Sequence, residues 1–129
     1  MGVADNPLGP FVDPVKGSIA SGSTPGVQPF DGWLFDPMTF IDDDGQAYMY
    51  FGGNGEGNLR VVKLNSDMVS VNGSAGKFNV PYFFEASWLH KHNGLYYFTY
   101  STNPSNGMRI DYMTSTNPMS GFTYRGVLS

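Results

Sequence analysis

Short apolar segments rich in aromatic residues alternate with polar segments rich in turn-forming residues along this chain. The apolar segments are about 4–8 residues long, which is the length of a β-strand and too short for most helices. No segment has the pattern of a long amphipathic helix. The pattern predicts strands at residues 34–41, 46–52, 58–64, 76–80, 83–91, 95–101, 108–114 and 121–127.

Turn signals separate these segments and favour antiparallel hairpins. Asp43-Asp44-Gly45, Asn93-Gly94 and Asn106-Gly107 each combine a residue that tolerates a positive φ with glycine, as tight hairpin turns require. Residues 13–33 are rich in Gly, Pro and Ser and predict a long connection without regular structure.

A gapless repeat relates the two halves of the chain. Residues 35–53 align with residues 84–102 at an offset of 49, so that Asp36 in the first copy meets Glu85 in the second. A period near 50 residues with several strands per repeat is typical of a β-propeller blade. Because the first strand of each blade lines the central channel, the two carboxylates are expected to converge there. Paired carboxylates are what glycoside hydrolysis requires.

A second, shorter repeat sets the expected domain organisation. Residues 6–11 align with residues 117–122, an Asn-Pro turn followed by a strand. We therefore expect one partial propeller domain over 1–129, with the closing strand of a preceding blade at 1–12 and two four-stranded antiparallel blades at 33–80 and 82–129. The fold class is all-β. A propeller has 4–8 blades, so the chain is expected to be part of something larger or a subunit that assembles.

Composition agrees with an all-β protein and narrows the partners. The chain contains 17 Gly, 9 Pro and no Cys, with a formal net charge of −4 and no cluster of basic residues. These features argue against nucleic acid and exclude disulfides and thiol chemistry. No apolar run approaches the roughly 20 residues that span a bilayer, and no secretion signal is visible. The compartment, cytoplasmic or secreted, stays open.

The candidate residues also have structural interpretations. Asp36, which precedes Pro37, is suited to capping a turn, and Glu85 to keeping an edge strand in solution. Asp42-Asp43-Asp44-Gly45 lacks the ligand spacing of a calcium loop and reads better as a solvated hairpin turn. His90 and His92 share one face of a strand, which permits metal binding, but exposed histidines beside a turn are the favoured interpretation.

Three segments carry a family resemblance. Residues 32–53, 81–103 and 109–122 resemble the second and third blades of glycoside hydrolase family 43. The resemblance covers nearly the whole chain and implies a five-bladed propeller of bacterial type. Members of that family are β-xylosidases, α-L-arabinofuranosidases and endo-arabinanases with an inverting mechanism.

The resemblance also implies site residues. Glu85 matches the general acid that protonates the leaving oxygen, and Asp36 matches the carboxylate that tunes the pKa of that acid and orients the substrate. Trp33, Phe35 and Trp88 flank these positions and are candidates for sugar binding. The general base, an Asp of the first blade, has no counterpart, and Asp13 is not assigned to it. No cofactor is expected for this chain. A calcium ion is possible in the full-length family fold, but the His that helps to organise the central ion in many members is not in this chain.

The function expected from these observations is inverting hydrolysis of arabinose- or xylose-containing plant polysaccharide, by an incomplete and weakly active or inactive catalytic domain. The alternative is a carbohydrate-binding module without catalysis, or a self-assembling half-propeller. The expected partners are a carbohydrate and either a second copy of the chain or the missing blades, with no nucleic acid and no membrane. Phe51, Tyr97 and Phe98 are expected to line the face that a neighbouring blade would cover.

Overall fold

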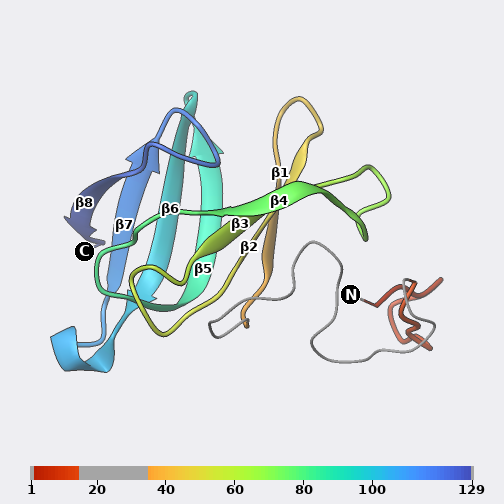
Figure 1. Ribbon diagram of the computed structural model, residues 1–129, viewed down its shortest axis with the longest axis horizontal. Coiled ribbons are helices and arrows are strands. Elements are labelled where there is room, and N and C mark those ends of the chain that lie inside the picture. Colours follow the sequence, from red (N-terminus) through yellow and green to blue (C-terminus); the bar gives the residue numbers. More distant parts are fainter. Residues whose placement is uncertain (1, 15–34, 129) are drawn as a thin grey trace.

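Two four-stranded antiparallel sheets make up most of the described part of the protein (Figure 1). The computed structural model describes residues 2–14 and 35–128. Strands pair in chain order within each sheet, so that both sheets are simple meanders. The first sheet contains β1 (Met38–Ile41), β2 (Ala47–Phe51), β3 (Arg60–Leu64) and β4 (Val71–Lys77). The second contains β5 (Phe83–His92), β6 (Leu95–Thr102), β7 (Ile110–Ser115) and β8 (Thr123–Val127).

Two of the three tight hairpin turns expected from the sequence are confirmed, and the third is part of a longer loop. At the β5–β6 turn, Asn93 has φ +48° and Gly94 has φ +76°, so both central residues occupy the left-handed region that a type I′ turn requires. At the β1–β2 turn, the Gly45 N–H donates to the Asp42 carbonyl oxygen at 2.9 Å, and Gly45 has φ +83°. The Asn106-Gly107 signal lies at the end of η1 (Pro104–Asn106), a single 3-10 turn between β6 and β7.

Two strand boundaries differ from the prediction. The first strand was expected from residue 34, but β1 begins at Met38, because Asp36 has φ +49° and Pro37 has no N–H to give to a ladder. Asp36 therefore lies just before the innermost strand and not within it. The outer strand was expected at 76–80, but β4 spans Val71–Lys77. The apolar residues of 76–80, Phe78 and Val80, turn into the core between the sheets instead.

The main hydrophobic core lies between the two sheets. Tyr50 and Val61 from the first sheet pack with Phe98 and Tyr100 from the second, and all four side chains are at most 1% exposed. Phe78 stacks on Phe122 with ring centroids 5.0 Å apart, joining the segment after β4 to the segment before β8. The Tyr50 hydroxyl also donates to the Pro118 carbonyl oxygen across the sheets. This packing holds the two sheets as neighbours.

A smaller core covers the other face of the first sheet, where Phe51 packs with Met49, Val62 and Leu64. Phe51 and Phe98 are therefore buried, at 3% and 0% exposure. Their expected place on an exposed blade face is wrong, because each belongs to a core already formed by this chain. Tyr97 alone of the three is only partly buried.

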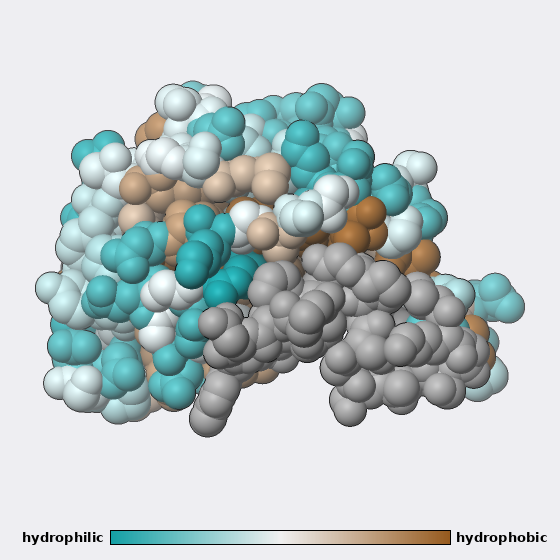
Figure 2. Space-filling view, viewed as in Figure 1, coloured by the Kyte–Doolittle hydropathy of each residue, from teal (hydrophilic) through white to brown (hydrophobic). Residues whose placement is uncertain are grey.

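The amino-terminal segment lies apart from the sheets in Figure 1. Within it, Val3 and Val12 form an isolated antiparallel bridge, which is all that represents the expected closing strand. Trp33 and nearly all of the expected 13–33 connection lie outside the described residues. Over 2–14 and 35–128, no helix is long and apolar enough to cross a membrane. The face seen in Figure 2 carries several separate apolar patches between larger hydrophilic areas.

Candidate active site

Asp36 and Glu85 come together where the two sheets meet. β1 and β5, the first strands of the two sheets, lie in contact. The Ala86 N–H, next in the chain to Glu85, donates a hydrogen bond to Asp36 Oδ2 at 3.2 Å. Asp36 is exposed and Glu85 is partly buried. The structure thus brings the Asp36 carboxylate to the backbone of the residue that follows Glu85.

The backbone around Glu85 is irregular, although it lies within a strand. Glu85 pairs with Ser101 of β6, but the β5–β6 register shifts on both sides of it, and Ala86 has φ +59°. Bulges and left-handed residues that carry a side chain cost free energy and occur often beside functional sites, where they redirect side chains. Here the bulge turns the Ala86 N–H toward Asp36.

The turn after β2 connects both acidic segments, which the sequence analysis did not foresee. The Gly52 N–H donates to the Phe35 carbonyl oxygen at 3.0 Å, and the Asn54 N–H donates to the Phe84 carbonyl oxygen at 2.7 Å. Phe35 and Phe84 are the residues directly before Asp36 and Glu85. A signal was present, because Gly52 and Gly53 stand where the second repeat has Ser101 and Thr102.

The three sugar-binding candidates have different surroundings. Phe35 is partly buried, with its ring against the backbone of Gly53. Trp88 is 59% exposed in β5, opposite Thr99. Trp33 is outside the described residues. Sugar binding by Phe35 and Trp88 therefore stays a prediction.

Ser87 is a further residue near the acid that the sequence did not indicate. It is 6% exposed, and its Oγ is buried without a hydrogen-bond partner among the described residues. Buried hydroxyls usually have partners. Ser87 directly follows Ala86, whose N–H donates to Asp36, so it adds a buried hydroxyl close to this contact between the sheets.

A second polar cluster joins the sheets through their hairpin turns. Lys91 Nζ lies 2.7 Å from Asp42 Oδ1 and 2.9 Å from Asp43 Oδ2, and the Tyr96 hydroxyl donates to Asp42 Oδ2. Burial opposes ionisation of Asp42, but the hydrogen bonds from Lys91 and Tyr96 outweigh it and lower its pKa. The expected hairpin turn is confirmed, but Asp42 is bound to the neighbouring sheet and not simply solvated.

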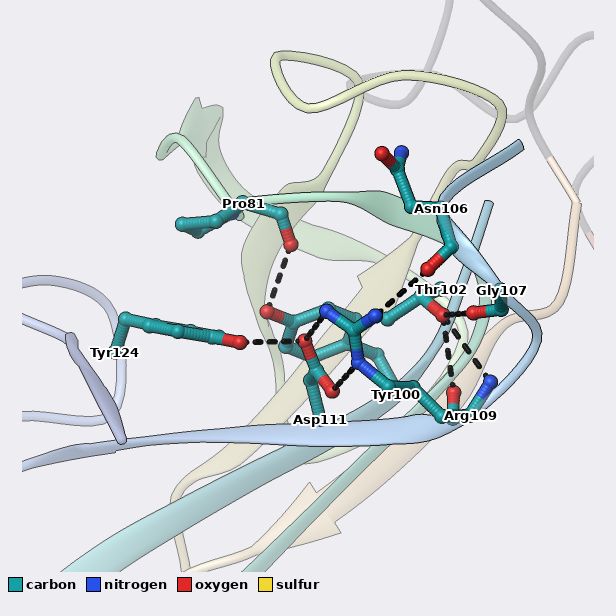
Figure 3. Close-up of polar contacts among 8 residues, drawn as sticks. All are labelled: Pro81, Tyr100, Thr102, Asn106, Gly107, Arg109, Asp111 and Tyr124. Carbon is teal, nitrogen blue, oxygen red and sulfur yellow. Dashed lines mark hydrogen bonds and ion pairs between the residues drawn. The ribbon is translucent and has the colours of Figure 1, made fainter. Parts of the chain in front are cut away.

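Asp111 forms the centre of a third polar cluster, within the second sheet (Figure 3). Its fully buried carboxylate accepts from Arg109 Nε at 2.8 Å and Nη2 at 3.1 Å, and from the Tyr124 hydroxyl at 2.7 Å. The hydrogen bond to Asp111 and then burial raise the pKa of Tyr124. The Arg109 guanidinium also lies over the Tyr82 ring, 5.4 Å from its centroid. The cluster organises the loop between β6 and β7.

The histidines show no metal-binding arrangement. The His90 ring stacks on Tyr97 with centroids 5.1 Å apart, and His92 Nε2 lies 3.0 Å from Asn93 Nδ2. Over the described parts of the chain, no group of three or more His, Cys, Asp or Glu side chains is placed to hold a metal ion.

Two neighbouring four-stranded antiparallel meanders have the architecture of β-propeller blades. Residues 1–122 match the model of glycosyl hydrolases family 43, and the chain belongs to this family. The expected fold class, two four-stranded antiparallel blades of a five-bladed propeller, is thereby confirmed.

Among the relatives, an α-L-arabinofuranosidase structure from Clostridium thermocellum ATCC 27405 is 56% identical with a TM-score of 0.82, over 98% of this chain and 42% of that one. The arabinoxylan arabinofuranohydrolase of Bacillus subtilis (strain 168) is 44% identical over 95% of this chain and 28% of its own length. A structure of the Bacillus subtilis enzyme holds cellotetraose. The β-xylosidase of Xylanibacter ruminicola is 34% identical over 98% of this chain and 47% of its own length. The chain therefore spans less than half the length of these relatives.

Proposed function

We propose that this chain supplies the general acid and a second carboxylate of an inverting glycosidase that removes α-L-arabinofuranosyl groups from arabinoxylan-type polysaccharide. The observation that carries the proposal is the hydrogen bond from the Ala86 N–H to Asp36 Oδ2, which brings one carboxylate to the residue beside the other. Because of this hydrogen bond between the sheets, we favour a catalytic function over the interpretation that the two acidic side chains only keep the surface in solution.

In the proposed reaction, Glu85 gives its proton to the glycosidic oxygen as the bond from that oxygen to the anomeric carbon breaks. A water molecule adds to the anomeric carbon from the opposite side and loses a proton to a general base, which yields the sugar with inverted configuration. Asp36 would orient the sugar and stabilise the positive charge that develops on its ring. The general base is not assigned to a residue of this chain.

The proposed substrate rests on similarity. The arabinofuranosidase and arabinofuranohydrolase relatives are more similar to this chain than the β-xylosidase. Trp88, exposed in β5 three residues after Glu85, offers an aromatic face for a sugar ring. An arabinofuranosyl substituent is therefore a better candidate than a terminal xylosyl residue.

The test compares two aryl α-L-arabinofuranosides that differ in leaving group. Glu85→Gln should slow hydrolysis of the 4-nitrophenyl substrate by about 10²–10⁴-fold. It should slow the 2,4-dinitrophenyl substrate far less, because that leaving group departs without a proton. Asp36→Asn should slow both substrates similarly. Asp67→Asn, an exposed aspartate in the β3–β4 turn, serves as the matched control and should change neither rate.

Proton NMR of the first product formed should show inverted configuration. Equal losses on both substrates for Glu85→Gln would remove it as the acid. Absence of hydrolysis by the unaltered protein, together with measurable binding of arabinoxylan oligosaccharides, would favour the carbohydrate-binding alternative.

A further inference from the structure

We infer that the loop between β2 and β3, residues 52–59, is a positioning element that sets the separation of Asp36 and Glu85. The catalytic meaning of this inference rests on the proposed function. Its geometric content does not, because it concerns how one loop of the first sheet holds the acid-bearing strand of the second.

The first support is the pair of backbone hydrogen bonds that the loop donates. Gly52 and Asn54 donate to the carbonyl oxygens of Phe35 and Phe84, at 3.0 and 2.7 Å. Each acceptor belongs to the residue that immediately precedes a carboxylate. The two donors stand on either side of Gly53. Because only Gly53 separates the two donors, the distance between the Phe35 and Phe84 segments is limited to the span of this one residue.

The second support is the lack of space at Gly53. A Cβ on this residue would lie 2.3 Å from Phe35 Cζ and 2.6 Å from the Phe84 carbonyl oxygen. The φ of Gly53 is outside the left-handed region that favours glycine. Gly53 is thus required for close approach and not for backbone conformation. Any side chain there would separate the Phe35 segment from the Phe84 segment.

The third support is a second attachment of the same loop to the strand that carries the acid. Glu56 Oε1 accepts from the Tyr82 N–H at 2.8 Å, and the Glu56 carbonyl oxygen accepts from the Val80 N–H at 2.9 Å. Both donors lie just ahead of β5. Together with the bond to Phe84, three hydrogen bonds join the loop to β5 and to the segment just before it, which fixes the approach of the chain to Glu85.

The loop conformation is held by Asn58. Its Nδ2 donates to the carbonyl oxygens of Gly53 and Asn54, at 3.0 and 3.3 Å. Gly53 and Asn54 belong to the part of the loop that is hydrogen-bonded to both Phe35 and Phe84. Asn58 contacts neither carboxylate in the described structure, so any effect of its removal on catalysis must pass through the loop.

The principal variant is Gly53→Ala, and the chain offers a matched control. Gly57 lies in the same loop, its φ is also outside the left-handed region, and an added Cβ would meet nothing within 4 Å. Gly57→Ala therefore makes the same chemical change without moving either acidic segment. Asn58→Ala is the second variant, which loosens the loop without adding bulk and guards against misfolding of Gly53→Ala.

The geometric readout is the Ala86 amide, followed by proton–nitrogen NMR. In Gly53→Ala and in Asn58→Ala, the Ala86 resonance should shift and its hydrogen exchange should speed up by at least about tenfold, because the bond to Asp36 is lost. In Gly57→Ala, the Ala86 amide should be unchanged. An Ala86 amide that is unaltered in both Gly53→Ala and Asn58→Ala overturns the inference.

The kinetic readout separates positioning from stability. Misplacement by about 1 Å can cost about 10²-fold in rate, so Gly53→Ala should lower kcat for the aryl arabinofuranoside by about that factor and change KM little. A loop that only stabilises the fold would lower the melting temperature and leave kcat of the folded enzyme intact, which would contradict the inference. If the unaltered protein hydrolyses no arabinofuranoside, as a chain without an assigned general base can do, the kinetic readout does not apply and the Ala86 amide alone decides the inference.

Discussion

Asp111 shows how a single residue organises the loop end of the second sheet. Its carboxylate is fully buried, and both of its oxygens accept hydrogen bonds, from Arg109 and Tyr124. A buried charge without such partners is strongly unfavourable. Arg109 also contacts the Tyr82 ring and the Asn106 carbonyl oxygen, which extends the cluster to the start of β5 and to η1.

We therefore expect Asp111→Ala to destabilise the fold by about 1–3 kcal/mol, because the Tyr124 hydroxyl and the partly exposed Arg109 lose their shared acceptor. Tyr124→Phe removes one hydrogen bond to the same carboxylate and should cost about 1–2 kcal/mol. Urea unfolding at neutral pH measures both. Equal costs for the two variants would show that the Arg109 pairing adds nothing.

The place of a site residue in the fold can be predicted from the sequence when that residue has an equivalent in the other copy of the repeat. Asp36 and Glu85 occupy equivalent repeat positions, so their convergence followed from the period alone. Gly53 and Ser87 were missed for a physical reason: what matters at Gly53 is a Phe35 ring and a Phe84 carbonyl that arrive from distant parts of the chain. Such close approach leaves no local pattern beyond the glycine itself.

At the scale of elements, local turn chemistry made the hairpins predictable. The Asn93-Gly94 turn needs two positive φ angles, and few other residue pairs supply them at so little cost. β4 was misplaced because its sequence, VNGSAGK, is poor in the residues that favour strands, while the nearby Phe78 and Val80 are strong candidates that pack elsewhere. Pairing with β3, a tertiary effect, decides that strand.

The cluster of Asp42, Lys91 and Tyr96 predicts an acid-sensitive attachment between the first and second sheets. The pKa of Asp42 is lowered from its ordinary 3.8 in the folded state. Its contribution to stability is therefore present above about pH 4 and is lost as pH falls through the folded pKa. The unaltered protein should be more stable than Asp42→Asn at pH 6, and this difference should shrink toward pH 2–3.

Urea unfolding of both proteins across this pH range provides the measurement. Asp43→Asn is the matched control, because Asp43 also pairs with Lys91 but its side chain is 86% exposed. An exposed pair of this kind contributes little. A stability difference between the unaltered protein and Asp42→Asn that is constant with pH would contradict the assignment.

At the scale of the whole molecule, the two faces of the second sheet differ. The face toward the first sheet carries the main core. The outer face carries Trp88, His90 and Tyr97, with Ile110 beside them opposite Ser101. Trp88 is 59% exposed and Ile110 is 43% exposed. Exposed apolar side chains on one face of a sheet favour contact with another protein surface.

We expect this chain to self-associate through that outer face. Light scattering at increasing concentration should give a mass above that of the monomer. The double variant Trp88→Asp/Ile110→Asp should be monomeric, since charges placed on the face oppose its burial. Ile41→Asp, at an equally exposed position on β1, is the control and should still associate. A monomeric unaltered protein at high concentration would sink this expectation.

The attachment of the β2–β3 loop to the second sheet has a consequence for recombination between relatives. The connection from Lys77 to Phe83 would be the obvious place to join sequences from two parents, because it separates the two meanders. Yet residues 52–58 of the first sheet are bonded to residues 80–84 of the second. A chimera divided in that connection would unite a loop from one parent with an acid-bearing strand from the other. Functional hybrids should instead take residues 52–58 and residues 80–84 from the same parent, although these two segments belong to different blades.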